Sequence, residues 1–240
     1  MVSGKQRKAL MKTLGLIGGM SWESTIPYYS TINEYVKNQL GGLHSAKIIL
    51  HSVDFHDIEQ LQSQGDWQQA ARVLSDIAMG LEKAGAEAIV ICTNTMHKVA
   101  DAVENASQLP LLHIADATGE SIAKQGMKKV GLLGTRYTME QDFYRQRIHD
   151  RYGIDVIIPD SAGRETVNRV IYEELCQGKI DAGSRQAYRE IITQLERQGA
   201  EGIILGCTEI PLLLSADDAN VPLFDTTTLH AIAAAKYALS

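Results

Sequence analysis

The sequence predicts an α/β protein made of two similar domains that are related by a pseudo-twofold axis. Each domain is expected to hold a mainly parallel sheet flanked by helices. Three observations support this prediction: short apolar runs alternate with helical segments, part of the first half recurs in the second, and the composition is that of an ordinary globular protein.

The apolar runs are continuous rather than alternating, which is typical of strands covered by helices on both faces. We expect strands at residues 13–18, 48–53, 88–92 and 111–114 of the first half, and at 129–134, 155–158, 202–205 and 223–225 of the second. Segments with helical periodicity lie between them, at 25–40, 67–84, 139–152, 165–177 and 184–198, and a last helix is expected at 231–239. This alternation of strands and helices predicts parallel sheets.

Two segments of the first half recur in the same order in the second. LGLIG at 14–18 returns 116 residues later as VGLLG, and GAEAIVICT at 85–93 returns 114 residues later as GAEGIILGC. Such nearly equal offsets predict two homologous halves of about 115 residues. The expected domains are 11–117, completed by 222–240, and 118–221.

Composition and charge exclude several classes of protein. The chain of 240 residues is 45% hydrophobic and 22% charged, and it is long enough to bury a core without disulfides or metals. A net charge of −6 leaves no basic footprint for nucleic acid, and no apolar run reaches the roughly 18 residues of a membrane helix. The three cysteines form no disulfide frame or zinc motif. We therefore expect a cytoplasmic protein, with residues 1–10 as a disordered extension.

The duplication predicts where a ligand binds. Ligands of parallel sheets bind outside the carboxyl ends of the strands, and the third predicted strands of the two halves end at the aligned residues Thr93 and Cys207. Two domains that face each other would bring both residues to one cleft. Proton-handling side chains on opposite walls of a cleft are what inversion of a carbon centre requires.

Three motifs carry a family resemblance. They are GGMSWEST at 18–25, TNTMH at 93–97 and GCTEIP at 206–211. With them the chain resembles, from Met11 to its C-terminus, the cofactor-independent aspartate/glutamate racemases. It is most similar to the bacterial amino-acid racemases of aspartate/glutamate-specific or broad specificity. The resemblance implies an active site in the interdomain cleft, an amino-acid substrate, neither pyridoxal phosphate nor metal, and a homodimer.

The resemblance also implies the catalytic pair. The family usually carries a cysteine at both strand ends, but its first cysteine falls on Thr93 here. Cys92 is one residue away, so it should face the other side of the strand and be buried. An alcohol is a far weaker base than a thiol. We therefore expect Cys207 to remove the Cα proton of the L-enantiomer and Thr93 to return one, so that the two enantiomers are processed unequally.

The residues that would bind the substrate follow from the same motifs. In the family's manner, Asn94, Thr95 and Thr208 would bind the α-carboxylate and amine. Met20 and the segment with Thr135 and Thr138 follow the first strands of the two halves and are expected to line the cleft.

Two further positions bear on the side chain of the substrate. Glu209 is also expected to bind the substrate. It stands where glutamate racemases of cell-wall synthesis carry histidine, which favours the aspartate-type branch. Gln62 lies roughly where the family places an arginine for the distal carboxylate, and Arg164 is a competing candidate. An amide in place of a guanidinium would weaken strict selection for acidic substrates.

Other residues have structural as well as functional interpretations. His97 lies one helical turn beyond Thr93, where it either polarises the site or packs. Trp22 and Trp67 are expected to pack, although Trp22 could close over the cleft. The loop at 53–57 lacks a second ligand cluster, and the glycines at 15, 18 and 19 do not form GxGxxG, so neither a metal nor a nucleotide is expected.

Two alternatives remain open at this point. Related malonate-type decarboxylases keep a single cysteine, and maleate isomerases use the same cleft. A chain with threonine in place of one catalytic cysteine is also compatible with a non-catalytic protein that binds an acidic amino acid.

Overall fold

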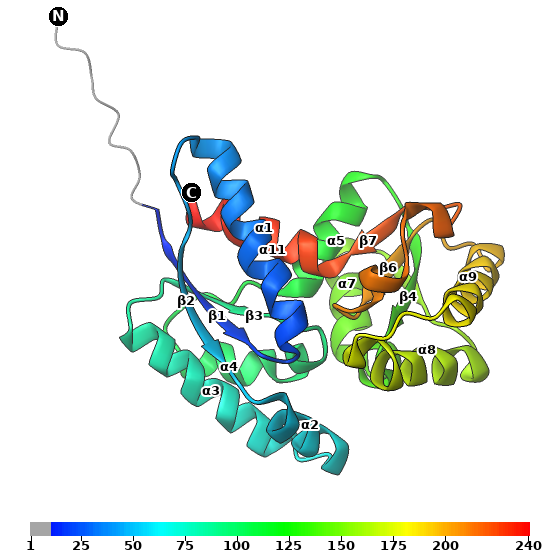
Figure 1. The fold of residues 1–240 in the computed structure, drawn as a ribbon, viewed down its shortest axis with the longest axis horizontal. Helices are drawn as coiled ribbons and strands as arrows, with labels where there is room; N and C mark the ends of the chain where they lie inside the picture. Colours follow the sequence, from blue (N-terminus) through cyan, green and yellow to red (C-terminus); the bar gives the residue numbers. More distant parts are fainter. Residues whose placement is uncertain (1–10) are drawn as a thin grey trace, which may run out of the picture.

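A computed structural model describes residues 11–240, so the prediction for residues 1–10 lies outside the described part of the chain. Two parallel sheets stand side by side, each within its own set of helices (Figure 1). The first sheet has the order β2-β1-β3 and the second the order β5-β4-β6-β7. The predicted α/β class with two similar parallel sheets is confirmed.

The first half begins with β1 (Thr13–Gly18), α1 (Trp22–Leu40) and β2 (Lys47–Ser52). Next come α2 (Phe55–Gln64), α3 (Trp67–Lys83) and β3 (Ala88–Ile91). After β3 follow a short 3-10 helix (Thr95–Val99) and α4 (Ala100–Ala106), and α5 (Ile114–Lys124) leads into the second half.

The second half repeats the pattern. It holds β4 (Lys129–Gly134), α6 (Arg136–Glu140), α7 (Asp142–Tyr152), β5 (Asp155–Ile157), α8 (Ser161–Glu173) and a 3-10 turn (Leu175–Gln177). It continues with α9 (Ala182–Arg197), β6 (Ile203–Gly206), α10 (Ile210–Leu213), a second 3-10 turn (Ala216–Asp218), β7 (Leu223–Asp225) and α11 (Thr226–Ala238).

The last helix joins the two halves. β7 pairs with β6 in the second sheet, and α11 leaves it to cross the molecule and pack against α1 and α5 (Figure 1). The backbone N–H of Lys12 donates to the Ala238 carbonyl at 2.9 Å, which ties this end of α11 to the start of β1. Of the predicted completing segment 222–240, the helix therefore lies against the first half and the strand lies in the second sheet.

The strands of the first sheet are covered on both faces, as the continuous apolar runs predict. Leu14 and Leu16 face α1 and α11, where Tyr28, Ile32 and Ala231 are fully buried. Ile17 points to the opposite face and packs with α3. The second half has a single large core that α5, α7, α8 and α9 all enter.

Several predicted elements differ in the structure. Residues 111–114 do not form a strand: only Leu111 bridges to Ile89, and α5 starts at Ile114. The predicted loop after β2 is mostly helix α2, which Asp54 caps by accepting from the His56 N–H at 3.0 Å. The predicted helix 139–152 is two helices, because Gln141 is extended (φ −95°, ψ 149°).

Residues 11–240 include no helix with both the length and the apolar character needed to cross a bilayer.

Candidate active site

One pocket lies where the two halves meet. Its walls come from both halves: Met20, Phe55, Gln62, Thr93, Asn94 and Thr95 from the first, and Thr135, Ile171, Tyr172, Cys176, Gly206, Cys207, Thr208 and Glu209 from the second. It encloses about 380 Å³ when its open mouth is included.

The pocket holds Thr93 and Cys207 together. Thr93 follows β3 and Cys207 follows β6, so each stands just beyond the carboxyl end of the third strand of its half. The two side chains approach the pocket from equivalent elements of the two sheets, as the internal duplication predicts. Cys92, in contrast, is fully buried among the residues between the first sheet and α11, as predicted.

Cys207 is hydrogen-bonded to a buried carboxylate. Its thiol donates to Oε2 of Glu209 at 3.0 Å, and the Thr208 hydroxyl donates to the same oxygen at 2.9 Å. The other oxygen, Oε1, accepts from the Ser21 hydroxyl at 2.7 Å. Glu209 is 4% exposed, and Ser21 belongs to the β1–α1 loop of the first half. The carboxylate therefore joins the catalytic cysteine candidate to the opposite half of the molecule.

The surroundings of Cys207 disfavour a free thiolate. Burial raises the pKa of its thiol well above the ordinary value, and the charge of Glu209 raises it further. A second thiol, Cys176, also lines the pocket, and burial raises the pKa of Cys176 to about 12. Both cysteines of the pocket are accordingly thiols at neutral pH.

Asn94 carries a buried acceptor that has no partner among the described residues. Its Nδ2 donates to the Thr226 hydroxyl at 3.0 Å, and that hydroxyl donates to the Leu205 carbonyl at 2.8 Å. Because the Thr226 hydrogen is used on Leu205, Thr226 needs a donor, which fixes the orientation of the Asn94 amide. Oδ1 of Asn94 is then left free to accept from a ligand.

A chain of hydroxyls spans the pocket between the halves. Thr95 Oγ1 lies 3.0 Å from Thr135 Oγ1, which lies 3.2 Å from Thr138 Oγ1. Thr95 and Thr135 line the pocket, whereas Thr138 is fully buried behind Thr135. The structure thus places Thr138 where it supports Thr135 rather than where it could touch a substrate.

The two candidates for the distal carboxylate lie in different places. Gln62 lines the pocket on α2, with Nε2 3.1 Å from the Met96 sulfur. Arg164 is not among the lining residues: its guanidinium pairs with Glu140 at 2.8 Å and donates to the Pro159 carbonyl. None of the residues that line the pocket is cationic.

Glycine at position 19 shapes the loop that carries Met20 and Ser21. Its φ is +89°, and a Cβ there would lie 2.3 Å from the Val53 carbonyl oxygen. The loop is therefore pressed against the end of β2, which only glycine permits. This contact fixes the position from which Met20 enters the pocket.

The strand end at Thr93 is held from behind by His97. His97 Nε2 accepts from the Ile114 N–H at 3.2 Å, so the proton is on Nδ1, which donates to the Thr93 carbonyl at 2.7 Å. Burial lowers the pKa of His97 well below its ordinary value. His97 does not line the pocket, and the packing interpretation of this histidine fits the structure.

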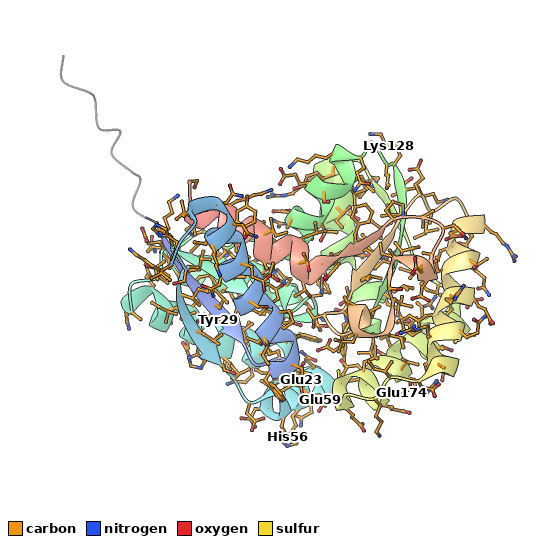
Figure 2. The ribbon with its side chains drawn as sticks, turned by 45° about the horizontal axis from the view of Figure 1, so that its top comes forward. Glu23, Tyr29, His56, Glu59, Lys128 and Glu174 are labelled. Atoms are coloured by element: carbon orange, nitrogen blue, oxygen red, sulfur yellow. The ribbon has the colours of Figure 1, made fainter. Side chains whose placement is uncertain are left out.

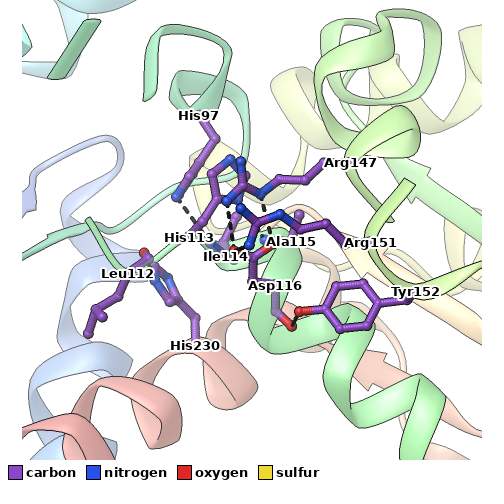
Figure 3. Close-up of polar contacts among 10 residues, drawn as sticks. All are labelled: His97, Leu112, His113, Ile114, Ala115, Asp116, Arg147, Arg151, Tyr152 and His230. Atoms are coloured by element: carbon purple, nitrogen blue, oxygen red, sulfur yellow. Dashed lines mark hydrogen bonds and ion pairs between the residues drawn. The ribbon is translucent and has the colours of Figure 1, made fainter. Parts of the chain in front are cut away.

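His97 belongs to a buried polar cluster between the halves (Figure 3). His113 Nδ1 accepts from the Ala115 N–H and caps α5, and His230 of α11 donates from Nε2 to the Leu112 carbonyl at 2.6 Å. Beside them Arg147 binds Asp116 with two hydrogen bonds of 2.7 Å, joining α7 to α5. The cluster positions the backbone behind the pocket without entering it.

Sequence reasoning missed several members of the site. Cys176 and Tyr172 enter from the end of α8 and the turn after it, where the sequence predicted only a helix. Ser21 belongs to a recognised motif, but its bond to Glu209 depends on how the halves face each other. Trp22, expected to pack, is 62% exposed, whereas Trp67 packs edge-to-face on Tyr137.

Comparisons with known proteins agree with this architecture. The model of the Asp/Glu/hydantoin racemase family matches residues 17–234. The broad-specificity amino-acid racemase RacX of Bacillus subtilis is 25% identical over 219 residues, which cover 89% of this chain and 92% of RacX.

Solved structures extend the comparison. A candidate Asp/Glu racemase from Yersinia pestis is 68% identical, with a TM-score of 0.91 over 96% of this chain and 100% of that one. An aspartate racemase homologue from Pyrococcus horikoshii is 35% identical, with a TM-score of 0.83 over 96% and 100% of the two chains. A variant of arylmalonate decarboxylase, 14% identical with a TM-score of 0.55 over 94% and 93%, shares the fold alone.

The family model spans most of the described chain, including the whole second sheet and, in the first sheet, β2, β3 and the end of β1. The chain therefore belongs to the Asp/Glu/hydantoin racemase family.

Proposed function

We propose that the protein is an amino-acid racemase that acts on aspartate and glutamate by two-sided proton transfer at Cα, without pyridoxal phosphate. One observation carries the proposal: Thr93 and Cys207, from equivalent strand ends of two similar halves, line the same pocket. A carbon held between them can lose a proton on one face and gain one on the other.

The two directions should differ in rate because the two groups differ in acidity. A cysteine thiolate is a competent base, whereas a threonine hydroxyl is a weak one and serves better as a donor, directly or through a water. Cys207 takes the α-proton of the L-enantiomer, and Thr93 supplies the proton to the opposite face. The preference for the L-enantiomer follows from this assignment.

The pocket offers groups for the rest of an amino acid. The free Oδ1 of Asn94 is an acceptor suited to the α-ammonium. The hydroxyl pair of Thr95 and Thr135 can direct one hydrogen at the α-carboxylate, which gains charge as the α-proton leaves. The Thr208 hydroxyl already donates to Glu209, so it can serve the substrate only as an acceptor.

Selection for an acidic side chain rests on weaker features. Gln62 supplies an amide where a guanidinium would bind a carboxylate more strongly. The adjoining groove contains Arg136 together with Glu59, Tyr137, Asn168 and Tyr172, and Tyr172 is shared with the pocket. Glu59 and Glu23 lie on the first half where it approaches the second (Figure 2). We therefore expect neutral amino acids to be accepted alongside aspartate and glutamate.

Chiral chromatography of single enantiomers tests the proposal. L-aspartate, D-aspartate, L-glutamate and D-glutamate are incubated separately with the protein, with and without added pyridoxal phosphate. We expect the opposite enantiomer to form without the cofactor, and faster from the L-forms. Activity that depends on pyridoxal phosphate, or no inversion of any amino acid, would refute the proposal.

A decarboxylase is a second candidate, favoured by the single cysteine at the two strand ends. Cys207 would then protonate the carbanion left by loss of carbon dioxide, and Thr93 would not need to act as a base. Release of carbon dioxide from a disubstituted malonate, with no inversion of amino acids, would identify this reaction. Tight binding of an acidic amino acid without either reaction would instead identify a binding protein.

A further inference from the structure

The carboxylate of Glu209 needs an explanation that substrate binding does not give. Its two oxygens already accept three hydrogen bonds, from Cys207, Thr208 and Ser21. It is also the one carboxylate among the residues that line the pocket. A buried carboxylate would repel the carboxylates of the proposed substrate, so the sequence-based assignment of Glu209 to substrate binding does not suit its position.

The position of Glu209 relative to Cys207 constrains how a thiolate can form. With Sγ and Oε2 only 3.0 Å apart, ionisation of both groups would place two negative charges side by side in a buried site. One proton must therefore remain between them. If the thiol loses its proton to Oε2, the pair keeps a single negative charge, and no additional charge is buried.

We propose that Glu209 is the base that takes the thiol proton of Cys207 when the substrate is bound, and that Ser21 is a positioning residue that holds Glu209 for this transfer. The inference rests on the proposed function. It adds the step that converts the resting thiol into the group that attacks the α-hydrogen.

The proton balance closes over one turnover. The S–H bond of Cys207 breaks and an O–H bond forms at Oε2 of Glu209; the thiolate then takes the Cα proton and becomes a thiol again. A water held by Thr93 gives its proton to the opposite face of the carbanion, leaving hydroxide. The proton on Glu209 neutralises that hydroxide, and carboxylate, thiol and water are restored.

The other titratable groups around the pair do not offer a competing base. Cys176 of the 3-10 turn, Tyr172 of α8 and Tyr188 of α9 face the pair, and burial raises the pKa of each. All three are therefore protonated at neutral pH. Glu23 of α1 acts on Cys176, but no hydrogen bond joins it to Cys207 among the residues described.

The duplication explains why a thiol paired with a carboxylate is present in the second half only. Aligning Thr93-Asn94-Thr95 with Cys207-Thr208-Glu209 places Thr95 opposite Glu209. The first half therefore has neither the thiol nor its carboxylate. Both differences act in the same direction and restrict efficient proton removal to Cys207.

Glu209→Gln separates this role from a passive one, because an amide can neither take up the thiol proton nor carry the negative charge. Two quantities are measured: exchange of the α-proton of L-glutamate in D2O across pH, and the thiolate absorbance at 240 nm without substrate. The absorbance of a Cys207→Ala variant is subtracted to remove the signals of Cys92 and Cys176. We expect the thiol of Cys207 to ionise at lower pH than in the wild type, yet exchange at pH 7 to fall about 100-fold, the lower end for a positioned base.

The rate of the variant should recover as pH rises, because hydroxide then replaces the missing base. If Glu209→Gln exchanges the α-proton at pH 7 as fast as the wild type or faster, the inference is overturned. That result would mean that Glu209 only keeps the thiol protonated and so slows the wild type. Equal pH midpoints for ionisation of the Cys207 thiol in the wild type and in Glu209→Gln would also overturn it. If the wild type exchanges the α-proton of no amino acid, the proposed function fails. The absorbance titration then tests by itself whether Glu209 and the thiol of Cys207 share a proton.

Glu209→Asp provides a second variant in case the amide disturbs folding. It keeps the negative charge but withdraws the carboxylate by one methylene from Sγ. We expect the pH at which the Cys207 thiol is half ionised to stay high, and the rate of α-proton exchange at pH 7 to fall at least tenfold. Retention of full exchange by this variant would show that contact between Oε2 and Sγ is not required.

Discussion

The Ser21 hydroxyl of the first half lies 2.7 Å from Oε1 of Glu209 in the second half, and Oε2 of the same carboxylate lies 3.0 Å from the thiol of Cys207. The loop that carries Ser21 is pressed against β2 through Gly19. The hydrogen bonds around Cys207 are therefore linked to a backbone feature of the opposite half.

Ser21→Ala should lower kcat about tenfold and change KM little, because it removes a hydrogen bond to a charged group without touching the substrate. Ser21→Thr, which keeps the hydroxyl, should restore most of the rate. Ser30→Ala is the matched control, since the Ser30 hydroxyl only donates to carbonyls of its own helix. Steady-state rates for L-glutamate decide the matter: a rise in KM at constant kcat would mean that Ser21 binds substrate instead.

Thr93→Cys should accelerate the slow direction. An unperturbed cysteine thiol has a pKa near 8.5, whereas the alcohol that it replaces hardly ionises. We expect α-proton exchange of D-glutamate to rise about 100-fold, with exchange of L-glutamate less affected. Thr93→Ser, which retains an alcohol, is the control and should show no such rise. Equal rates for the two enantiomers in the wild type would remove the basis of this prediction.

Acid should destabilise the protein through its buried histidines. Burial lowers the pKa of His230 from 6.5 to about 4, and the pKa values of His97 and His113 are also lowered. Below about pH 6.5 these histidines bind protons in the unfolded chain, whereas in the folded chain they stay neutral. The stabilisation is thus complete above pH 6.5 and is lost as pH falls toward 4, by about 3 kcal/mol for His230 alone.

Thermal unfolding between pH 7.5 and 4.5 measures this loss. Tm should fall with pH, and the fall should be shallower in His230→Gln, which cannot take up the proton. The variant should also be less stable at pH 7.5, because the bonds to Leu112 and Tyr28 are weakened. An equal pH dependence in both proteins would show that His230 does not titrate on unfolding.

Gly19→Ala should destabilise the fold more than the same change at another glycine with positive φ. Gly85 has φ +98° but open space around its Cα, so alanine there costs about 1 kcal/mol for conformation alone. At Gly19 the new Cβ would also meet Val53 backbone atoms at 2.3 and 2.6 Å. Urea unfolding of the two variants compares these costs. Equal losses of free energy of unfolding would mean that the loop moves freely away from β2.

Much of the fold could be predicted because strands covered on both faces leave continuous apolar runs. The duplication located Thr93 and Cys207 at equivalent strand ends, and strand periodicity placed Cys92 on the other face. The strand expected at 111–114 did not form, because His113 caps α5 and α5 begins at Ile114. Helix α2 was not predicted because its segment has few apolar residues and shows no clear helical periodicity. Its start depends on the cap that Asp54 provides.

The site was predictable only where it follows strand ends. Motif positions identified Asn94, Thr95 and Thr208, and each of them lines the pocket. The positions of Cys176 and Tyr172 depend on how α8 ends against the opposite half, which no local pattern records. Likewise, the bond between Ser21 and Glu209 joins residues 188 positions apart in the chain. Contacts of this kind arise from the packing of the two halves.

The most direct test of Cys207-dependent proton transfer is proton NMR of L- and D-aspartate and L- and D-glutamate incubated with the protein in D2O, without added cofactor. Cys207→Ala is run beside the wild type. We predict loss of the α-proton signal with the wild type only, and faster for the L-enantiomers. Undiminished exchange by Cys207→Ala, or no exchange of any of the four amino acids by the wild type, would contradict the account.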